Sequence, residues 1–191
     1  MDKFNWRSIS GWFSEADSQF VLNMLKTIKD GICVEIGCFK GRSTAVMMPA
    51  AIKNNNEYYV IDNFYGGKDE TTPASKIQRC SGEQIKKEFI ENMKMIGMRR
   101  SDYRLWRCNS IDASVYFPDQ SLDLVFLDGD HAYESVKLDI ETWWKKIKKN
   151  GIIAGHDINN EDVSRAVKEF LIKNNITIFS GGNCWGFNKN V

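Results

Sequence analysis

The hydrophobic positions along the chain follow two different spacings. Short apolar runs that end in glycine or an acid predict buried strands, and apolar residues every three or four positions predict amphipathic helices. We expect strands at residues 32–37, 57–64, 103–108, 122–127, 151–155, 175–180 and 184–189. Helices are expected at residues 14–29, 42–53, 83–96, 132–148 and 161–173. Ser14 is the expected N-cap of the first helix, and Asp17 is an acid in its first turn.

Strands that alternate with helices predict a Rossmann-like, doubly wound α/β fold, in which helices cover both faces of a mostly parallel seven-stranded sheet. Only Gly181, Gly182 and Asn183 separate the last two strands. That spacing is typical of a hairpin, so one C-terminal strand should run antiparallel to its neighbours.

The order of these elements indicates one domain over residues 1–191, with an N-terminal helical segment over residues 1–30. No Pro/Gly/Ser-rich linker divides the chain. Residues 65–82 form a long polar stretch punctuated by Gly and Pro. A loop of this length either closes over a binding site as a lid or covers the surface as a plain loop.

Composition narrows the class of protein. The chain is 42% hydrophobic and 27% charged, which is ordinary for a soluble globular protein, and its formal net charge is +1. The balanced charge argues against a nucleic-acid partner, and no apolar run is long enough for a membrane span. The N-terminus lacks a signal-peptide pattern, so a cytoplasmic location is expected. The five cysteines form no CxxC pair, which argues against a disulfide framework or a zinc ribbon.

A glycine turn follows the first predicted strand, in the sequence EIGCFKGRST from Glu35 to Thr44. It matches neither the GxGxxG dinucleotide fingerprint nor a P-loop. The acid two residues before Gly37 suits a cationic or amine-bearing ligand better than a pyrophosphate, although a purely structural turn explains it equally well. Asp62 ends the second strand, where doubly wound folds bind a ribose diol or cap a loop. Together these residues describe a nucleoside site without a phosphate loop, which S-adenosylmethionine would fit.

Acids and both histidines of the chain follow the fourth and fifth strands. Asp128, Asp130 and His131 follow one strand, and His156 and Asp157 follow the other. These ends should meet at the carboxyl edge of a parallel sheet, where such folds bind ligands. Asp128 and Asp157 suit a divalent ion such as Mg²⁺ or Mn²⁺, with His156 as a third ligand or a support. His131 suits a general base, and Asp130 suits a helix cap.

Three stretches resemble the class I S-adenosylmethionine-dependent methyltransferases: VEIGCFKGRST, YYVIDNF and LDLVFLDGDHAYESVKLDIETWWKKIKKNGIIAGHD. More narrowly, they resemble methyltransferase family 24, which is similar to macrocin-type sugar O-methyltransferases and more distantly to catechol-type enzymes. The resemblance spans about residues 11–189. Its most specific part is the stretch from DGDHAYESV to GHD.

The resemblance implies a cofactor site for S-adenosylmethionine. The methionine part of the cofactor would lie against the glycine turn, the ribose against Asp62, and the adenine against the residues that follow the third strand. The implied cofactor-binding residues are Glu35, Gly37, Gly41, Ser43, Asp62, Ser110, Ile111 and Asp128.

The resemblance also implies a catalytic centre. His131 matches the base, and Asp128 would bind metal near the methyl group and so take part in catalysis. Mg²⁺ is the implied metal, held by Asp128, His156 and Asp157. His156 departs from the family's pattern, in which an acid stands at this position. That departure leaves both the identity of the metal and the need for it open.

The expected function is metal-assisted O-methylation of a hydroxyl group on a sugar or another small polyhydroxyl acceptor. The expected partner is therefore a small molecule, with no nucleic acid and no membrane, and a homo-oligomer stays open. Two alternatives remain. The fold could support another metal-dependent reaction such as hydroxylation, with Asp128, His131 and His156 as a facial triad. It could also be a cofactor-binding scaffold without catalysis.

Overall fold

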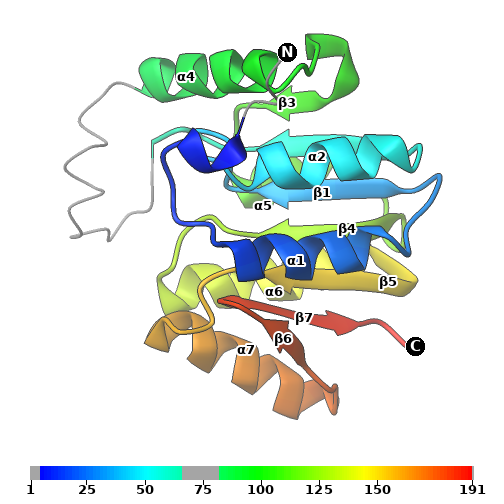
Figure 1. The fold of residues 1–191 in the computed structure, drawn as a ribbon. Helices are drawn as coiled ribbons and strands as arrows, with labels where there is room; N and C mark the ends of the chain where they lie inside the picture. The colour runs from blue at the N-terminus through cyan, green and yellow to red at the C-terminus, as the bar shows by residue number, and fades with distance from the viewer. Residues whose placement is uncertain (1–4, 66–81, 191) are drawn as a thin grey trace.

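A central sheet organises the chain, as the computed structural model shows for residues 5–65 and 82–190 (Figure 1). Its strand order is β3-β2-β1-β4-β5-β7-β6. The strands are β1 (Ile32–Ile36), β2 (Glu57–Ile61), β3 (Arg104–Trp106), β4 (Leu122–Leu127), β5 (Ile147–Gly155), β6 (Phe179–Gly181) and β7 (Cys184–Asn188). β1 to β5 pair in parallel, whereas β7 runs antiparallel to both β5 and β6. The predicted seven-stranded sheet with an antiparallel C-terminal strand is confirmed.

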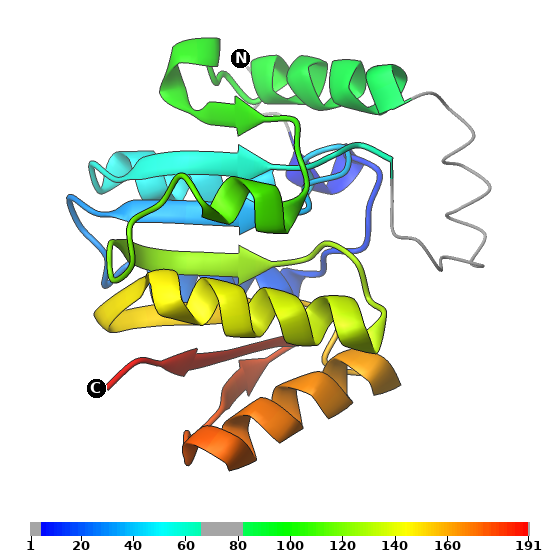
Figure 2. The ribbon, with the colours of Figure 1, turned by 180° about the vertical axis from the view of Figure 1, so that it is seen from behind.

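Helices cover both faces of this sheet. On the face nearer the viewer in Figure 1 lie α1 (Glu15–Leu25), α2 (Thr44–Lys53) and α4 (Gly82–Met95). On the opposite face, seen in Figure 2, lie α5 (Ser110–Ser114), α6 (Tyr133–Lys146) and α7 (Glu161–Asn174). Short 3₁₀ turns occupy Trp6–Ser8 and Arg100–Asp102. The fold is the Rossmann-like, three-layered α/β arrangement that the alternation of elements predicts.

Two apolar cores hold the layers together. One contains Met47 of α2 and Phe89 of α4, and the other contains Trp143 of α6 and Val167 of α7; all four side chains are fully buried. The strands of the sheet contribute to both, because successive side chains of a strand point to opposite faces. No helix among the described residues has the length and apolar character needed to cross a membrane. The four described cysteines are free.

Several boundaries differ from the prediction. The helix expected to reach residue 148 ends at Lys146, because Ile147 already pairs with Leu122 at the start of β5, ahead of an irregularity in the ladder. The sixth strand starts at Phe179 rather than at residue 175. Asn175 instead ends α7 in the left-handed conformation, with φ 51°. The short helix α5 was not predicted. Residues 66–81 of the expected loop lie outside the described residues.

The segment before α1 is fixed to the glycine turn by Arg42. Its guanidinium group donates to the backbone carbonyls of Phe13 at 2.9 Å, Gly11 at 3.0 Å and Ile9 at 3.3 Å. Ser14 caps α1 as predicted, within a capping box that it forms with Asp17. The N-terminal segment is thereby held over the carboxyl edge of the sheet, with the ring of Phe13 centred 5.5 Å from that of His156.

Candidate active site

Four chemically active side chains converge at the carboxyl edge of the sheet. Leu127 of β4 pairs with Gly155 of β5, so the residues that follow these strands lie side by side. Oδ2 of Asp157 lies 2.9 Å from Nε2 of His131 and 3.3 Å from Nδ1 of His156. Oδ1 of Asp128 lies 4.0 Å from Nε2 of His131 and 3.6 Å from Nδ1 of His156. The structure therefore brings together all four residues that the sequence placed in the catalytic centre.

The charges of these groups are strongly coupled. Interaction with Asp128 and Asp157 raises the pKa of His131 to about 10, against the opposing effect of burial. Burial alone would lower the pKa of His156, but the same two carboxylates raise it to about 11. Burial favours the protonated form of Asp157, yet the two imidazoles hold its pKa below the usual value. Two carboxylates that face two imidazoles form a site where positive charge is stabilised.

The two histidines differ in their access to a substrate. The His131 side chain is 32% exposed, whereas that of His156 is 3% exposed. His131 precedes α6 and can meet an acceptor at the surface. His156 lies behind the carboxylates and can act only through them or through an ion that they hold. A small cavity here is lined by Asp128, both histidines and apolar side chains that include Val136 and Trp185.

Asp130, next to His131, fixes the start of α6. Its carboxylate accepts from the backbone N–H of Ala132 at 3.3 Å and from the Ser135 hydroxyl at 2.8 Å. Asp130 is therefore not the N-cap that the sequence suggested, because Ala132 occupies that position, but its hydrogen bonds hold the turn that contains His131.

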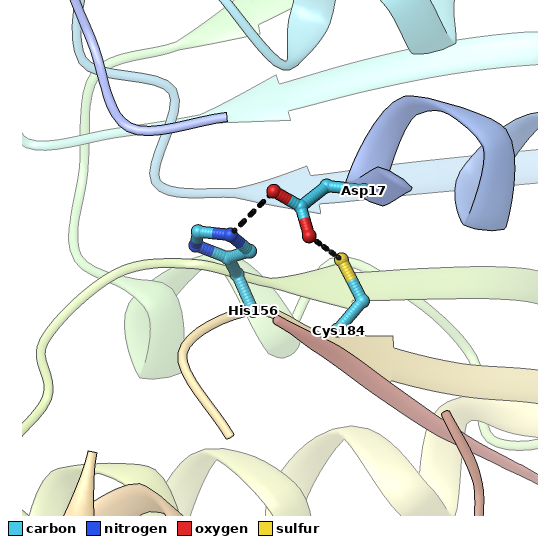
Figure 3. A group of neighbouring side chains, drawn as sticks. All are labelled: Asp17, His156 and Cys184. Carbon is cyan, nitrogen blue, oxygen red and sulfur yellow. Dashed lines mark hydrogen bonds and ion pairs between the residues drawn. The ribbon is translucent and has the colours of Figure 1, made fainter. Parts of the chain in front are cut away.

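A buried cluster supports His156 from the side opposite Asp157. Asp17 of α1 lies between His156 and Cys184 of β7, as Figure 3 shows. Oδ2 of Asp17 is 3.3 Å from Nε2 of His156, and Sγ of Cys184 is 3.7 Å from Oδ1 of Asp17. Asn183 donates its backbone N–H to Oδ1 of Asp17 at 2.6 Å and its side-chain amide to Oδ1 of Asp157 at 2.8 Å.

Glu35, a predicted cofactor-binding residue, is fully buried beneath the glycine turn. Its carboxylate accepts hydrogen bonds from Ser43 at 2.6 Å and from Tyr58 at 3.0 Å. Burial raises the pKa of Glu35 to about 7, although these hydrogen bonds oppose the shift. In this structure Glu35 and Ser43 join β1 to the start of α2, and direct contact with the cofactor stays a prediction for both.

The two glycines of the turn each lie close to another segment of the chain, and a larger side chain would not fit at either position. Gly37 has φ +80°, and a Cβ atom there would lie 2.2 Å from the backbone oxygen of Asp128. Gly41 has φ +88°, and its Cβ would lie 2.6 Å from the Met93 side chain of α4. Gly37 therefore lets the ends of β1 and β4 come together, which fixes the backbone of Asp128.

Asp62 holds the same turn from the end of β2. Its Oδ2 atom accepts from the backbone N–H groups of Cys38 at 2.7 Å and Phe39 at 2.9 Å, and Oδ1 accepts from that of Phe64 at 2.6 Å. The half-buried carboxylate lies where the ribose is expected, and Oδ1 retains a lone pair for a hydroxyl.

Ser110 and Ile111, the residues expected beside the adenine, begin α5. The Ser110 hydroxyl donates to Asp139 at 2.5 Å and accepts from the indole N–H of Trp143 at 2.7 Å. Burial raises the pKa of Asp139 to about 6, against the effect of the Ser110 hydrogen bond. The Ser110 side chain is therefore turned toward α6, and its backbone and the half-buried Ile111 remain for an adenine ring.

Sequence reasoning missed Asp17, Asn183 and Cys184 as parts of this site. Asp17 was expected only as an acid in the first turn of a helix, and Asn183 only as part of a hairpin. The hairpin offered one signal that could have located Asn183. A strand that runs antiparallel beside β5 must start at the carboxyl edge of the sheet, so the turn before it lies at that edge.

Comparisons with known proteins identify the family of the chain. The sequence matches a family model described as "methyltransferase domain", methyltransferase family 24, over residues 34–158, more than half of the chain. A search of the curated proteins finds no match.

Solved structures share the fold. A cofactor-bound protein, Rv0187 from MTB, matches with a TM-score of 0.68 and 13% identity, covering 96% of this chain and 84% of that one. An S-adenosylmethionine-dependent O-methyltransferase from Thermotoga maritima matches with a TM-score of 0.66 and 14% identity, covering 95% and 68%. A TDP-rhamnose 3'-O-methyltransferase of calicheamicin biosynthesis matches with a TM-score of 0.60 and 13% identity, covering 90% and 76%. Identities this low show the fold alone, whereas the family match covers the glycine turn, the ends of β4 and β5 and both histidines. The chain therefore belongs to methyltransferase family 24 and is a class I S-adenosylmethionine-dependent methyltransferase.

Proposed function

We propose that the protein transfers the methyl group of S-adenosylmethionine to a hydroxyl oxygen of a sugar or another small polyhydroxyl acceptor, with the help of a divalent metal ion. One observation carries this proposal. Two carboxylates and two imidazoles converge at the edge of the sheet where the glycine turn of a methyltransferase lies. The likeness to a TDP-rhamnose 3'-O-methyltransferase supports a sugar as the acceptor.

The donor set fits a divalent ion. Ligand atoms of Asp128, His131 and Asp157 lie within 4.8 Å of one another, and Nδ1 of His156 lies 3.3 Å from Oδ2 of Asp157. We assign Asp128, His156 and Asp157 as the residues that would hold the metal. Bound there, the ion would supply Lewis acidity that lowers the pKa of a substrate hydroxyl. Of the two histidines, the more exposed His131 stays available for the substrate.

The remaining chemistry is assigned to residues of the chain. When Asp128 and Asp157 hold the ion, their negative charge is neutralised and no longer raises the pKa of His131. The neutral imidazole, held by Asp157, would then take the proton of the acceptor hydroxyl as the oxygen attacks the methyl carbon. The new O–C bond forms as the S–C bond breaks, and S-adenosylhomocysteine leaves. The protein's main contribution is to hold the oxygen and the methyl group in line. The proposed cofactor-binding residues are Glu35, Gly37, Gly41, Ser43, Asp62, Ser110, Ile111 and Asp128. Glu35, Ser43 and Ser110 also support the turn and the helices that follow it.

A direct assay tests the proposal. The protein is incubated with S-adenosylmethionine and a panel of free and nucleotide-linked sugars, with a divalent ion or with EDTA. S-adenosylhomocysteine release and the methylated product are measured by mass spectrometry. We expect a methyl ether that depends on both the acceptor and the metal. Full turnover in EDTA would reject the metal's role, and cofactor binding without transfer to any hydroxyl acceptor would reject O-methylation.

A further inference from the structure

We propose that Asp17 is a positioning residue that turns Nδ1 of His156 toward the metal site and so selects ions that accept an imidazole ligand over Mg²⁺. The inference rests on the metal-assisted reaction proposed above. It adds a residue from the N-terminal helix α1, outside the stretch that matches the family model.

The orientation of the His156 ring carries the first step. The ring lies between two sets of carboxylates, with Nε2 3.3 Å from Oδ2 of Asp17 and Nδ1 3.3 Å from Oδ2 of Asp157. The side chains of His156 and Asp17 are each only 3% exposed. A carboxylate can only accept, and both ring nitrogens face carboxylates. An ion held by Asp128 and Asp157 would replace the proton on Nδ1, and the remaining proton would stay on Nε2, toward Asp17.

Asp17 is itself held firmly, which makes it suitable as an orienting group. Oδ2 accepts the backbone N–H of Ser14 at 2.7 Å, and Oδ1 accepts that of Asn183 at 2.6 Å. Helix α1 and the β6–β7 turn thus fix the carboxylate from two directions (Figure 3). Metal-bound histidines commonly donate their second ring N–H to such a carboxylate, which sets the tautomer and the ring orientation.

The same hydrogen bonds argue against a second metal centre at Asp17, His156 and Cys184. Ligand atoms of these three residues also lie within 4.8 Å of one another. However, each oxygen of Asp17 already accepts a backbone N–H, and Oδ2 also faces Nε2 of His156, so an ion bound there would compete with these contacts. We therefore assign the cluster to orientation, with Cys184 as a neighbour of Asp17 and not a ligand.

The choice of metal follows from the ligand type. Mg²⁺ prefers an all-oxygen site, whereas imidazole suits Zn²⁺ and other first-row transition ions. With Nδ1 of His156 presented between Asp128 and Asp157, the site offers nitrogen and oxygen ligands together. We expect it to bind Zn²⁺ or Co²⁺ more tightly than Mg²⁺.

Metal titrations of the full-length protein test the assignment. Zn²⁺ and Mg²⁺ binding are measured by calorimetry for the wild type, Asp17→Asn, Gln19→Ala and Cys184→Ser. The Asn amide would donate toward Nε2 and favour the wrong tautomer, so Asp17→Asn should weaken Zn²⁺ binding by about 10- to 100-fold. Gln19→Ala changes an exposed residue of the same helix and should leave Zn²⁺ affinity unchanged, whereas Cys184→Ser should weaken it less than Asp17→Asn does. His156→Asp should lower the ratio of Zn²⁺ to Mg²⁺ affinity by about tenfold or more.

A spectroscopic measurement on the wild type keeps the test independent of variant folding. In the ¹⁵N spectrum of the Zn²⁺-loaded protein, His156 should be metal-bound at Nδ1 and protonated at Nε2. Any one of three results would overturn the inference. The metal could be bound at Nε2, Asp17→Asn could bind Zn²⁺ as tightly as the wild type does, or Cys184→Ser could lose as much Zn²⁺ affinity as Asp17→Asn. These results would leave the methyltransferase proposal standing, because methyl transfer is measured separately.

Discussion

The side-chain amide of Asn183 donates to Oδ1 of Asp157 at 2.8 Å. This bond connects the turn before the last strand to a carboxylate of the catalytic centre. The other oxygen of Asp157 is the one that faces both imidazoles. The position of that oxygen therefore depends on a residue in a hairpin that the family match does not include.

Asn183→Ala should reduce turnover by about 10- to 100-fold, because the carboxylate proposed to bind the metal loses its support. Stability should fall by about 1.5–3 kcal/mol, the usual contribution of a hydrogen bond to a charged group. Asn160→Ala is the matched control. The side chain of Asn160 caps α7 by accepting from the N–H groups of Asp162 and Val163. Its backbone N–H, which donates to the Asp157 carbonyl, is retained in the alanine variant. Asn160→Ala should lower the free energy of unfolding by about 1 kcal/mol and leave turnover unchanged. Equal turnover in both variants would contradict the assigned support.

His131→Ala should bind S-adenosylmethionine with the affinity of the wild type and lose about 10²- to 10⁴-fold in turnover, since it removes the base and leaves the glycine turn unchanged. Calorimetry gives the affinity, and product formation gives the rate. Undiminished turnover would remove His131 from the base role.

Gly37→Ala should destabilise the protein at least twice as much as Gly97→Ala. Both glycines have positive φ, at +80° and +87°, so the backbone strain is comparable. A Cβ at Gly97 meets nothing within 4 Å, whereas one at Gly37 would overlap the backbone of Asp128. The strain alone is worth about 1–2 kcal/mol. Chemical denaturation of the two variants measures the difference, and equal losses would show that the ends of β1 and β4 can separate at little cost.

Glu35 should make stability depend on pH in an unusual direction. Its pKa is raised to about 7 in the folded protein from the ordinary value of 4.5. Between these values the folded state holds the proton more firmly than the unfolded state does, so the free energy of unfolding falls as pH rises from about 4.5 to about 7. The full change is about 3 kcal/mol. Below pH 4.5 both states are protonated and the contribution is constant.

Glu35→Gln isolates this effect, because the amide is neutral throughout the range. Urea unfolding of both proteins at intervals from pH 4.5 to 8 should show the wild type losing stability relative to the variant. Parallel curves would mean that Glu35 is not buried in its neutral form.

Ser110→Ala should lower stability by about 2 kcal/mol, since the Asp139 carboxyl and the Trp143 N–H both lose their partner. Affinity for S-adenosylmethionine should stay within about threefold of the wild type, less than 1 kcal/mol. Thermal unfolding and calorimetry measure the two quantities. A large loss of affinity without a loss of stability would instead place the hydroxyl on the cofactor.

The local pattern of the sequence was sufficient to predict the fold class and the carboxyl edge of the sheet at which the candidate site lies. The apolar runs locate β1 and β4, and parallel pairing alone requires Asp128 and Asp157 to be neighbours. The burial of Glu35 also had a signal. A central parallel strand is covered on both faces, so an acid within it cannot reach water.

Other features depend on contacts between distant parts of the chain. Asp17 reaches His156 only because Arg42 holds the segment before α1 and because β7 inserts beside β5. Neither of these two long-range contacts produces a recognisable pattern in the local sequence. The early start of β5 was missed because Lys148, Lys149 and Asn150 resemble a solvated helix end, although Ile147 is paired.

The strand order has a consequence for the way the protein is made. β7 lies between β5 and β6 in the sheet, although it is synthesised after both. During translation, β6 cannot reach its final neighbour until residues 184–188 have left the ribosome. Asp17 is synthesised before both strands, and it can accept the N–H of Asn183 only after that residue has emerged. Assembly of the site therefore cannot be complete before β7 has emerged, and the protein should become active only after β7 has paired with β5.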